Sequence, residues 1–353
     1  MDFQRSIDSS DIELFADMVA EASQFVITCH MTPDGDALGS SLGLCHVLGR
    51  LGKKAVVITP DTPASTLDFL PGFSDIVIAS RFPDRVNRAL GAADAVICLD
   101  FNSLKRIDRL APAVEACDAK KILIDHHLNP ESFADLTISR PDQSSTCALL
   151  FHILWQGGMY DQIDIDAATC IYTGMLTDTG NFSYNSNDPD LYLIISLLLA
   201  KGLDKDEVYS LAWNTHRAES LRINGYALYR KMQILPEHQL AVIVLEREEL
   251  NEFSYVKGDT EGLVNKPLAV PGVTWSVYLR QDEPDFVKVS MRSKGCFPVN
   301  VVCERLFGGG GHLNAAGGEF TGTVYEALDV LLAAIDEFDQ YLELTEIPQK
   351  NYR

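Results

Sequence analysis

Aspartate and histidine residues occur in four short segments of the chain, and each segment directly follows a run of apolar residues. The candidate metal ligands among them are His30, Asp34, Asp36, Asp100, His126 and Asp178, and Asp125 and His127 adjoin them. Crowded carboxylates repel one another strongly unless a cation lies between them. Carboxylates mixed with imidazoles suit Mn²⁺, Zn²⁺ or Fe²⁺, whereas sites made of oxygen alone suit Mg²⁺ better. The four segments together therefore predict a site for divalent metal ions.

Each segment taken alone also has a simpler interpretation. A D-x-D pair is commonly a solvated turn, and an aspartate after a strand commonly caps a helix. Asp178, in Asp-Thr-Gly, can begin a turn, and a His-His pair is commonly structural. The position of all four segments after apolar runs favours one shared site.

The apolar runs of the first half are typical of buried strands. They lie at 25–29, 55–59, 76–79, 93–99 and 121–124, with helical patterns between several of them, among them 37–51 before Gly52. This alternation predicts an α/β fold with a mostly parallel sheet. Ligands of such sheets bind beyond the carboxyl ends of the strands. The four acidic segments should therefore meet at one edge of the sheet.

The second half has a different pattern. Residues 188–235 are predicted to be mainly helical, with breaks at Gly202 and at 214–215. A second α/β region follows, with strands predicted at 239–245, 273–279 and 286–291 and helices at 298–307 and 324–344. The boundary between two domains should lie between residues 190 and 232.

Composition excludes several classes of protein. The 353 residues carry a net charge of −21, which repels long polyanions and argues against a protein that coats duplex DNA. The longest nearly apolar run, 191–200, is half of the ~20 residues that a membrane-spanning helix needs. The N-terminus is polar, without the apolar stretch of a secretion signal. Eight cysteines without a C-x-x-C pair indicate reduced thiols. We expect a cytoplasmic protein with no membrane partner.

Taken together, the motifs resemble those of the DHH phosphoesterase superfamily. The residues that match are His30-x-x-x-Asp34-x-Asp36, Asp100, Asp125-His126-His127 and Asp178. The segments Gly308–His312 and Asn314–Gly317 are similar to the glycine-rich signature of the associated DHHA1 domain. Within the superfamily, the motifs are most similar to the bacterial nanoRNase and pAp phosphatase group, where pAp is 3′-phosphoadenosine 5′-phosphate. That group is related to RecJ-type exonucleases and to exopolyphosphatases.

The resemblance implies a particular domain organisation. A parallel-sheet DHH domain that binds metal and carries catalysis would occupy residues 1–190, followed by a helical linker at 191–232. A smaller α/β DHHA1 domain that binds substrate would occupy 233–345, with a cleft between the two domains.

The resemblance also implies two divalent ions, preferably Mn²⁺, with Mg²⁺, Co²⁺ or Fe²⁺ as alternatives. One ion would be bound by His30, Asp34 and Asp100, and the other by Asp36, Asp100, His126 and Asp178, so that Asp100 bridges them. The candidate catalytic residues are Asp100, Asp125, which would orient an imidazole, and His127, which would face the substrate phosphate. Two ions about 3.5–4 Å apart would activate a water and stabilise charge on both sides of an in-line displacement.

Another set of residues would bind the substrate. It comprises Arg106, His127, Arg292, Gly309, Gly310, Gly311 and His312. Glycines let backbone N–H groups approach an anion, and a guanidinium group binds phosphate with two donors. The simpler interpretations are a flexible turn for the glycines and a helix surface for Arg106.

The expected activity is metal-dependent hydrolysis of pAp and of short single-stranded RNA or DNA. The preferred length is about two to five nucleotides, because the acidic chain offers longer strands no basic track, and long duplexes are excluded. The alternatives are an exopolyphosphatase or pyrophosphatase, a phosphodiesterase for the linear dinucleotide pApA, and a nucleotide-binding module without catalysis. A homodimer is one option for the assembly. Cys147 and Ala148 follow Ser145-Thr146 where related sequences often carry an acidic residue, which leaves the role of this helix open.

Overall fold

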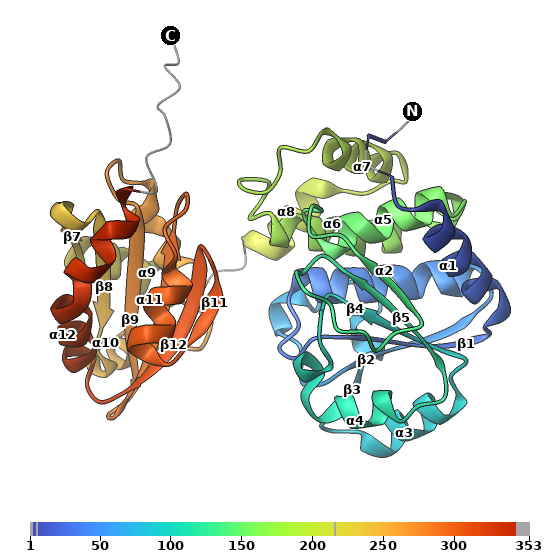
Figure 1. Cartoon of the computed structure of the whole chain (residues 1–353), viewed down its shortest axis with the longest axis horizontal. Coiled ribbons are helices and arrows are strands. Elements are labelled where there is room, and N and C mark those ends of the chain that lie inside the picture. The colour runs from blue at the N-terminus through green and yellow to red at the C-terminus, as the bar shows by residue number, and fades with distance from the viewer. Residues whose placement is uncertain (1–2, 5, 215–216, 344–353) are drawn as a thin grey trace, which may run out of the picture. The chain divides into compact units, whose positions relative to one another are not determined.

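The computed structural model describes residues 3–4, 6–214 and 217–343, and the chain divides into two compact units at residues 215/216 (Figure 1). The predicted break at residue 215 and the predicted ends at 344 and 345 lie outside the described residues. The segment 191–232, predicted as a linker, is divided between the units. Its first part packs with the N-terminal unit, and its last part belongs to the C-terminal unit.

The N-terminal unit is built on a parallel sheet of six described strands in the order β3-β2-β1-β4-β5-β6. The strands are β1 (Gln24–Cys29), β2 (Lys54–Thr59), β3 (Val77–Ile78), β4 (Ala95–Leu99), β5 (Lys120–Asp125) and β6 (Leu136–Ser139). The first five confirm the prediction. β6 was not predicted, because its four residues are too few to show a pattern and only two of them are buried.

Helices cover both faces of this sheet (Figure 1). The helices of this unit are α1 (Ser9–Glu21), α2 (Gly35–Arg50), α3 (Pro83–Ala92), α4 (Ala111–Glu115), α5 (Thr146–Gln156), α6 (Ile165–Asp178), α7 (Pro189–Ala200) and α8 (Lys205–Trp213). Of these, α7 packs on α5 and α6, and α8 packs on α6. Successive residues of a strand enter different cores: Ile97 packs with α1, α2, α5 and α6, and Val96 packs with α3 and α4. Burial on both faces explains why the strands are continuous apolar runs.

The strand order reverses beside β1. The chain runs from β1 through β2 to β3, and then returns to the other side of β1 for β4, β5 and β6. Parallel α/β sheets bind ligands at such a reversal, beyond the carboxyl ends of the strands. The crevice after β1 and β4 is therefore the expected site.

Glycines let α2 and α6 approach each other closely. A Cβ atom at Gly174 would overlap Sγ of Cys147 and would lie 2.8 Å from Oδ1 of Asp36. A Cβ atom at Gly35 would overlap the side chain of Thr177. This approach places the first turn of α2 beside the last turn of α6, next to the strand ends.

The C-terminal unit contains a mixed sheet in the order β11-β12-β10-β9-β8-β7, in which only β8 and β9 are parallel among the described pairs. The strands are β7 (Met232–Leu235), β8 (Leu240–Leu245), β9 (Trp275–Glu283), β10 (Phe286–Ser293), β11 (Gly310–His312) and β12 (Ala315–Thr321). The helices are α9 (Ala218–Tyr226), α10 (Arg247–Glu252), α11 (Val299–Phe307) and α12 (Val324–Ala334). The predicted two-part α/β architecture is confirmed.

Some predicted boundaries were wrong in this unit. Residues 232–235, predicted as helical, form β7, because they pair with β8 at the edge of the sheet. The helix predicted from 324 ends at Ala334 and continues as a 3₁₀ segment. The described 3₁₀ segments of the chain lie at Ser65–Leu67, Phe73–Asp75, Leu104–Leu110, Tyr160–Gln162, Pro236–His238, Leu263–Ala269 and Ile335–Tyr341, and a π-helical turn lies at Ala227–Lys231.

Two expectations from composition can be compared with the structure. All eight cysteines lie in the described residues and are free thiols. Among the described helices, none combines the length and the apolar character that crossing a bilayer requires.

Candidate metal centre

The four acidic segments meet at the carboxyl edge of the parallel sheet. His30 follows β1, Asp100 follows β4, and His126 follows β5. The sheet register pairs Cys29 with Leu99 and Leu99 with Ile124, so the three strand ends lie level. The remaining ligand candidates come from helix termini. Asp34 caps α2, Asp36 lies in its first turn, and Asp178 is the last residue of α6.

The first group of possible ligands surrounds His30. Its Nε2 atom lies 3.4 Å from Oδ2 of Asp100 and 3.7 Å from Oδ2 of Asp34. Its Nδ1 atom lies 2.8 Å from the carbonyl oxygen of Met31. A carbonyl can only accept, so Nδ1 carries the proton and the lone pair of a neutral ring lies on Nε2. The neutral ring therefore presents a nitrogen lone pair, which could bind a metal ion, beside the two carboxylates.

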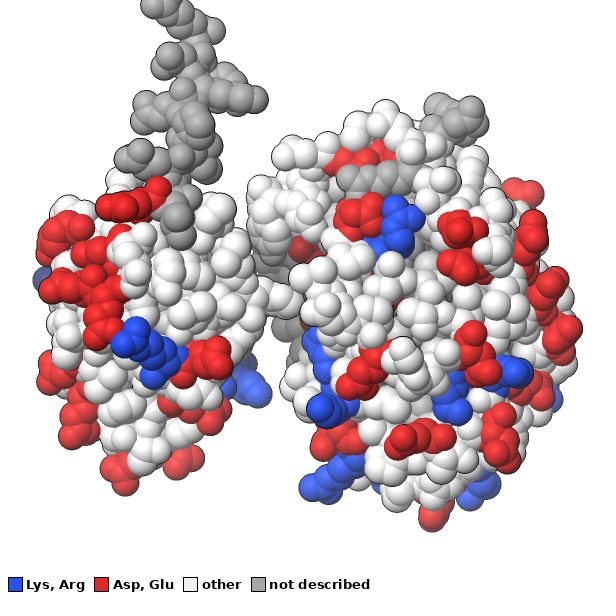
Figure 2. Space-filling view, viewed as in Figure 1, with Lys and Arg blue, Asp and Glu red and all other residues white. Residues whose placement is uncertain are grey.

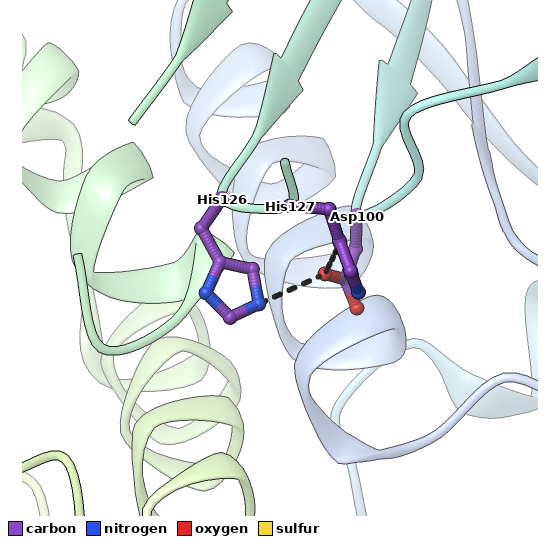
Figure 3. Close-up of side chains that lie close together, drawn as sticks. All are labelled: Asp100, His126 and His127. Carbon is purple, nitrogen blue, oxygen red and sulfur yellow. Dashed lines mark ion pairs between the residues drawn. The ribbon is translucent and has the colours of Figure 1, made fainter. Parts of the chain in front are cut away.

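The second group surrounds His126. Its Nε2 atom lies 3.6 Å from Oδ2 of Asp178, 3.9 Å from Oδ2 of Asp36 and 3.6 Å from Oδ1 of Asp100. Its Nδ1 atom lies 3.3 Å from the carbonyl oxygen of Gln143, which orients the ring as in the first group. Figure 3 shows His126 and His127 directed toward Asp100 from neighbouring positions of the chain.

Asp100 contributes one carboxylate oxygen to each group. Oδ2 faces His30, and Oδ1 faces His126. Its backbone has φ +63°, in the left-handed region that a non-glycine residue rarely adopts. Such strain persists only where the surroundings enforce it, and it is concentrated at functional sites. The backbone N–H of Asp100 donates to the carbonyl oxygen of Ile124 (3.2 Å), which holds this conformation.

The N-terminus of α5 holds two of the candidate ligand carboxylates. The backbone N–H groups of Thr146 and Cys147 donate to the two oxygens of Asp36, at 2.6 and 2.9 Å. The Thr146 hydroxyl donates to Oδ1 of Asp100 at 3.0 Å. The sequence leaves the role of this helix open, and the structure shows that it acts through backbone groups and one hydroxyl. In the sequence, Ser145 could have indicated this role, because it caps the helix and so fixes which residues carry the free backbone N–H groups.

His127 belongs to a different hydrogen-bonded set. Its Nδ1 atom lies 2.7 Å from Oδ1 of the fully buried Asp125, and its Nε2 atom lies 3.0 Å from a guanidinium nitrogen of Arg106. A guanidinium group can only donate, so Nε2 accepts and Nδ1–H donates to Asp125. The structure therefore brings Arg106 into the site, and Asp125 orients the imidazole of His127.

Burial and like charges make the cluster unfavourable without cations. Burial, with the charges of Asp100 and Asp34, raises the pKa of Asp36 well above its usual value. Burial and the charge of Asp36 raise the pKa of Asp178 to about 8, against the attraction of His126. Burial disfavours the charged form of His30, but Asp100 and Asp34 outweigh it and raise the pKa of His30 to about 10. Without metal ions, the site therefore retains protons, which supply the positive charge that bound cations would otherwise supply.

The ligand atoms fit divalent ions. Within each of the sets His30–Asp34–Asp100 and Asp36–His126–Asp178, the ligand atoms lie within 4.8 Å of one another. Nitrogen and oxygen ligands about 2.0–2.2 Å from one ion lie roughly 3.0–3.6 Å apart, close to the distances given above. A third set, Asp100–His126–His127, has the same spacing. In that set, Nδ1 of His127 is engaged by Asp125.

The other substrate-binding candidates lie in the C-terminal unit. Arg292 on β10 and His312 on β11 both pair with Ala315 on β12, one from each side. Directly paired residues point to the same face of a sheet, so Arg292 and His312 share a face with a small residue between them. The guanidinium group of Arg292 donates to the carbonyl oxygen of Met291.

The glycine run forms the edge strand β11 rather than a loop. A Cβ atom at Gly309 would overlap the backbone of Gly317, and one at Gly311 would overlap that of Ala315. These two glycines therefore permit β11 to approach β12. A Cβ atom at Gly310 would meet open space, so Gly310 is the position of the three at which a ligand has room.

Comparison with known proteins shows the family of the chain. Residues 24–175 match the model of the DHH family, N-terminal domain, and residues 239–340 match the DHHA1 domain. The chain is 31% identical over 316 residues to the bifunctional oligoribonuclease and PAP phosphatase NrnA of Thermus thermophilus, which covers 88% of this chain and 89% of the relative. The chain belongs to the DHH family.

Two solved structures show how this DHH protein compares in three dimensions. An exopolyphosphatase-related protein from Bacteroides fragilis is 44% identical and superposes with a TM-score of 0.94, over 97% of this chain and all of the other. RecJ from Thermus thermophilus, solved in complex with Mn²⁺, is 15% identical with a TM-score of 0.54, over 98% of this chain and 56% of RecJ. The likeness to RecJ concerns the fold alone.

Proposed function

We propose that this DHH-family phosphoester hydrolase uses two divalent cations, preferably Mn²⁺, to cleave short oligoribonucleotides and pAp. The observation that carries the proposal is the position of Asp100, whose two oxygens face two separate sets of ligand atoms. A relative that aligns with most of the chain is named as an oligoribonuclease and PAP phosphatase, which supports this choice of substrates.

The proposed ligands divide between the two cations. His30, Asp34 and Asp100 would hold one, and Asp36, Asp100, His126 and Asp178 the other. Bound as a pair, two such cations acidify a water and stabilise charge during an in-line phosphoryl displacement. The chain's own residues keep this geometry rigid: Thr146 and Cys147 fix the carboxylates, and the backbone carbonyls fix the imidazoles.

His127 and Arg106 are the proposed phosphate contacts of the N-terminal unit. Asp125 holds His127 in one orientation, and the Nε2 atom of His127 faces the guanidinium group of Arg106. A phosphate oxygen entering here would accept hydrogen bonds from Arg106 and, once the ring is protonated, from His127.

Arg292 and His312 are the proposed phosphate contacts of the C-terminal unit. The sheet register places them on one face, two strands apart, and Ala315 between them leaves room for a bound group. Gly310 adds a backbone position with open space. We expect this pair to bind a phosphate of the substrate at a distance from the cleaved bond.

Charge limits the length of the substrate. Acidic side chains are spread over both units on the face drawn in Figure 2, and the basic side chains occur there singly or in small groups. Each phosphate that a protein neutralises on a single strand adds about 0.7 to the logarithmic salt dependence. We expect that dependence to stop growing after the first few nucleotides, and efficiency to fall beyond about five.

A substrate panel tests the proposed function. The wild type and Asp100→Asn are assayed with pAp, pApA, single strands of 2 to 24 nucleotides, pyrophosphate and polyphosphate, each with Mn²⁺ and with Mg²⁺. We expect hydrolysis of pAp, pApA and the shortest strands, strongest with Mn²⁺ and lost in the variant. Preference for pyrophosphate or polyphosphate would support the exopolyphosphatase alternative, which the similarity to the Bacteroides fragilis protein makes the second candidate.

A further inference from the structure

A short loop joins α6, which ends in the metal centre, to α7, and it carries an exposed aromatic side chain. This side chain is Tyr184, which is 59% exposed. We propose that Tyr184 is a stacking surface for a base of the nucleotide whose phosphate the metal centre takes. The inference rests on the proposed function and adds a binding site for the base to it.

The backbone of Tyr184 is tied to the residue that follows a proposed ligand. Thr179 comes directly after Asp178 and is fully buried. Its carbonyl oxygen accepts hydrogen bonds from the N–H groups of Ser183 (3.0 Å) and Tyr184 (3.2 Å), and its hydroxyl accepts one from the N–H of Phe182 (3.0 Å). These bonds close the loop on itself, so Tyr184 keeps a fixed position relative to the carboxylate of Asp178.

The loop is held in an unfavourable backbone conformation. Gly180, Asn181 and Phe182 have φ values of +53°, +57° and +57° in succession. The left-handed region is costly for a residue with a bulky side chain. The ring of Phe182 compensates by packing with Tyr172 of α6 and Tyr192 of α7, at centroid distances of 5.8 and 6.4 Å. The loop is therefore anchored on both helices, and a preformed surface needs no ordering when a ligand binds.

The ring of Tyr184 lies against Gly180, two residues after Asp178. A Cβ atom at Gly180 would overlap the ring, so the glycine is what allows this contact. One side of the ring is supported by backbone while more than half of the side chain is accessible. Aromatic rings bind any base through its π face, and aliphatic side chains such as Leu128, which is also exposed beside the site, do not.

The experiment compares ligands with and without a base. Dissociation constants of adenosine 5′-phosphate, the product of pAp cleavage, and of ribose 5-phosphate, which lacks the base, are measured in Mn²⁺ for the wild type, Tyr184→Ala and Tyr184→Phe. Tyr229→Ala, which removes an exposed tyrosine of the C-terminal unit, is the matched control. We expect Tyr184→Ala to weaken binding of adenosine 5′-phosphate about 5- to 150-fold, the range measured for loss of one stacked base.

The other arms of the experiment separate stacking from other roles. Binding of ribose 5-phosphate should be unchanged in all variants, Tyr184→Phe should match the wild type, and KM for pAp should rise in Tyr184→Ala while its Mn²⁺ affinity stays constant. Equal loss for both ligands, or equal loss in Tyr184→Phe, would overturn the stacking role. If the wild type cleaves no nucleotide, the proposed function fails. Weaker binding of adenosine 5′-phosphate but not of ribose 5-phosphate in Tyr184→Ala would still support Tyr184 as a stacking surface. Unchanged discrimination between the two ligands in Tyr184→Ala would overturn the inference whatever the activity.

Discussion

The residues proposed for chemistry and those proposed for distant phosphate binding lie in two regions with contrasting surroundings. In the N-terminal unit, Asp36, Asp100 and Asp125 are buried, and each accepts hydrogen bonds from fixed partners. In the C-terminal unit, Gly310 and His312 are exposed on a three-residue edge strand. Groups that position metal ions must be held within a fraction of an ångström, so supporting contacts are expected around them. Groups that bind an anion on a surface need less support.

The largest expected effect comes from Asp100→Asn, which changes the carboxylate that lies between the two groups of proposed ligands. The change removes the charge that the proposed cations share, and kcat should fall by about a thousand-fold or more, because cation binding is worth several kcal/mol in the transition state. Asp161→Asn, at a carboxylate that is 93% exposed, is the control. Steady-state kinetics at saturating Mn²⁺ measures the change. Retention of a tenth of wild-type activity would contradict the role of Asp100.

Substitution in the exposed region should give a different kinetic signature. Arg292→Ala and His312→Ala should each raise KM for pAp about 10- to 100-fold, because a hydrogen bond to a charged group contributes about 1.5–3 kcal/mol. Mn²⁺ affinity should be unchanged, since neither residue belongs to the ligand sets. Lys288→Ala, on the same strand as Arg292, is the control. If both variants cleave every substrate normally, the C-terminal pair does not bind substrate.

Thr146→Val tests a hydrogen bond that holds a proposed ligand, and a smaller effect is expected than for loss of the ligand itself. It keeps the shape of the side chain and removes the hydroxyl that donates to Asp100. Loss of such an outer contact typically costs about 10- to 100-fold in metal affinity or activity, measured by Mn²⁺ titration and kcat. Thr146→Ser should restore most of the loss, and Thr137→Val, at an exposed position of β6, should have no effect. A Thr146→Val enzyme with wild-type metal affinity and kcat would show that the hydroxyl is dispensable.

The smallest expected effect is a pH dependence of stability that metal removes. The raised pKa values of His30 (about 10) and Asp178 (about 8) mean that the folded protein without metal keeps protons that the unfolded chain has already lost. The free energy of unfolding should therefore fall as pH rises through these values. In EDTA, the melting temperature should drop by a few degrees, about 2–4 °C per kcal/mol, between pH 5.5 and 8.5. Saturating Mn²⁺ should abolish most of this slope. If the melting temperature depends on pH equally in EDTA and in Mn²⁺, the pH dependence does not come from the charged groups of this site.

The same contrast explains what could be predicted from the sequence. Ligands at the ends of strongly apolar strands, such as Asp100 after β4, could be predicted because parallel strands end at one edge of a sheet. The support from Thr146 and Cys147 could not, because it is given by backbone groups of a helix that follows the short strand β6. In the C-terminal unit, β7 was mistaken for helix because its pairing with β8 is a tertiary interaction. Of the three glycines proposed to bind an anion, Gly309 and Gly311 also permit close packing on β12, a tertiary contact that the sequence pattern does not show.

The central claim is that Asp100 lies between two cations. Anomalous diffraction from crystals of the full chain soaked in Mn²⁺ tests it directly, with Asp100→Asn crystals as the control. We expect two peaks about 3.5–4 Å apart, one beside His30 and Asp34 and the other beside Asp36, His126 and Asp178, and weakened or absent peaks in the variant. A single peak would contradict the account. So would peaks found only elsewhere, for example at the cluster of His238, Asp336 and Asp339 in the C-terminal unit.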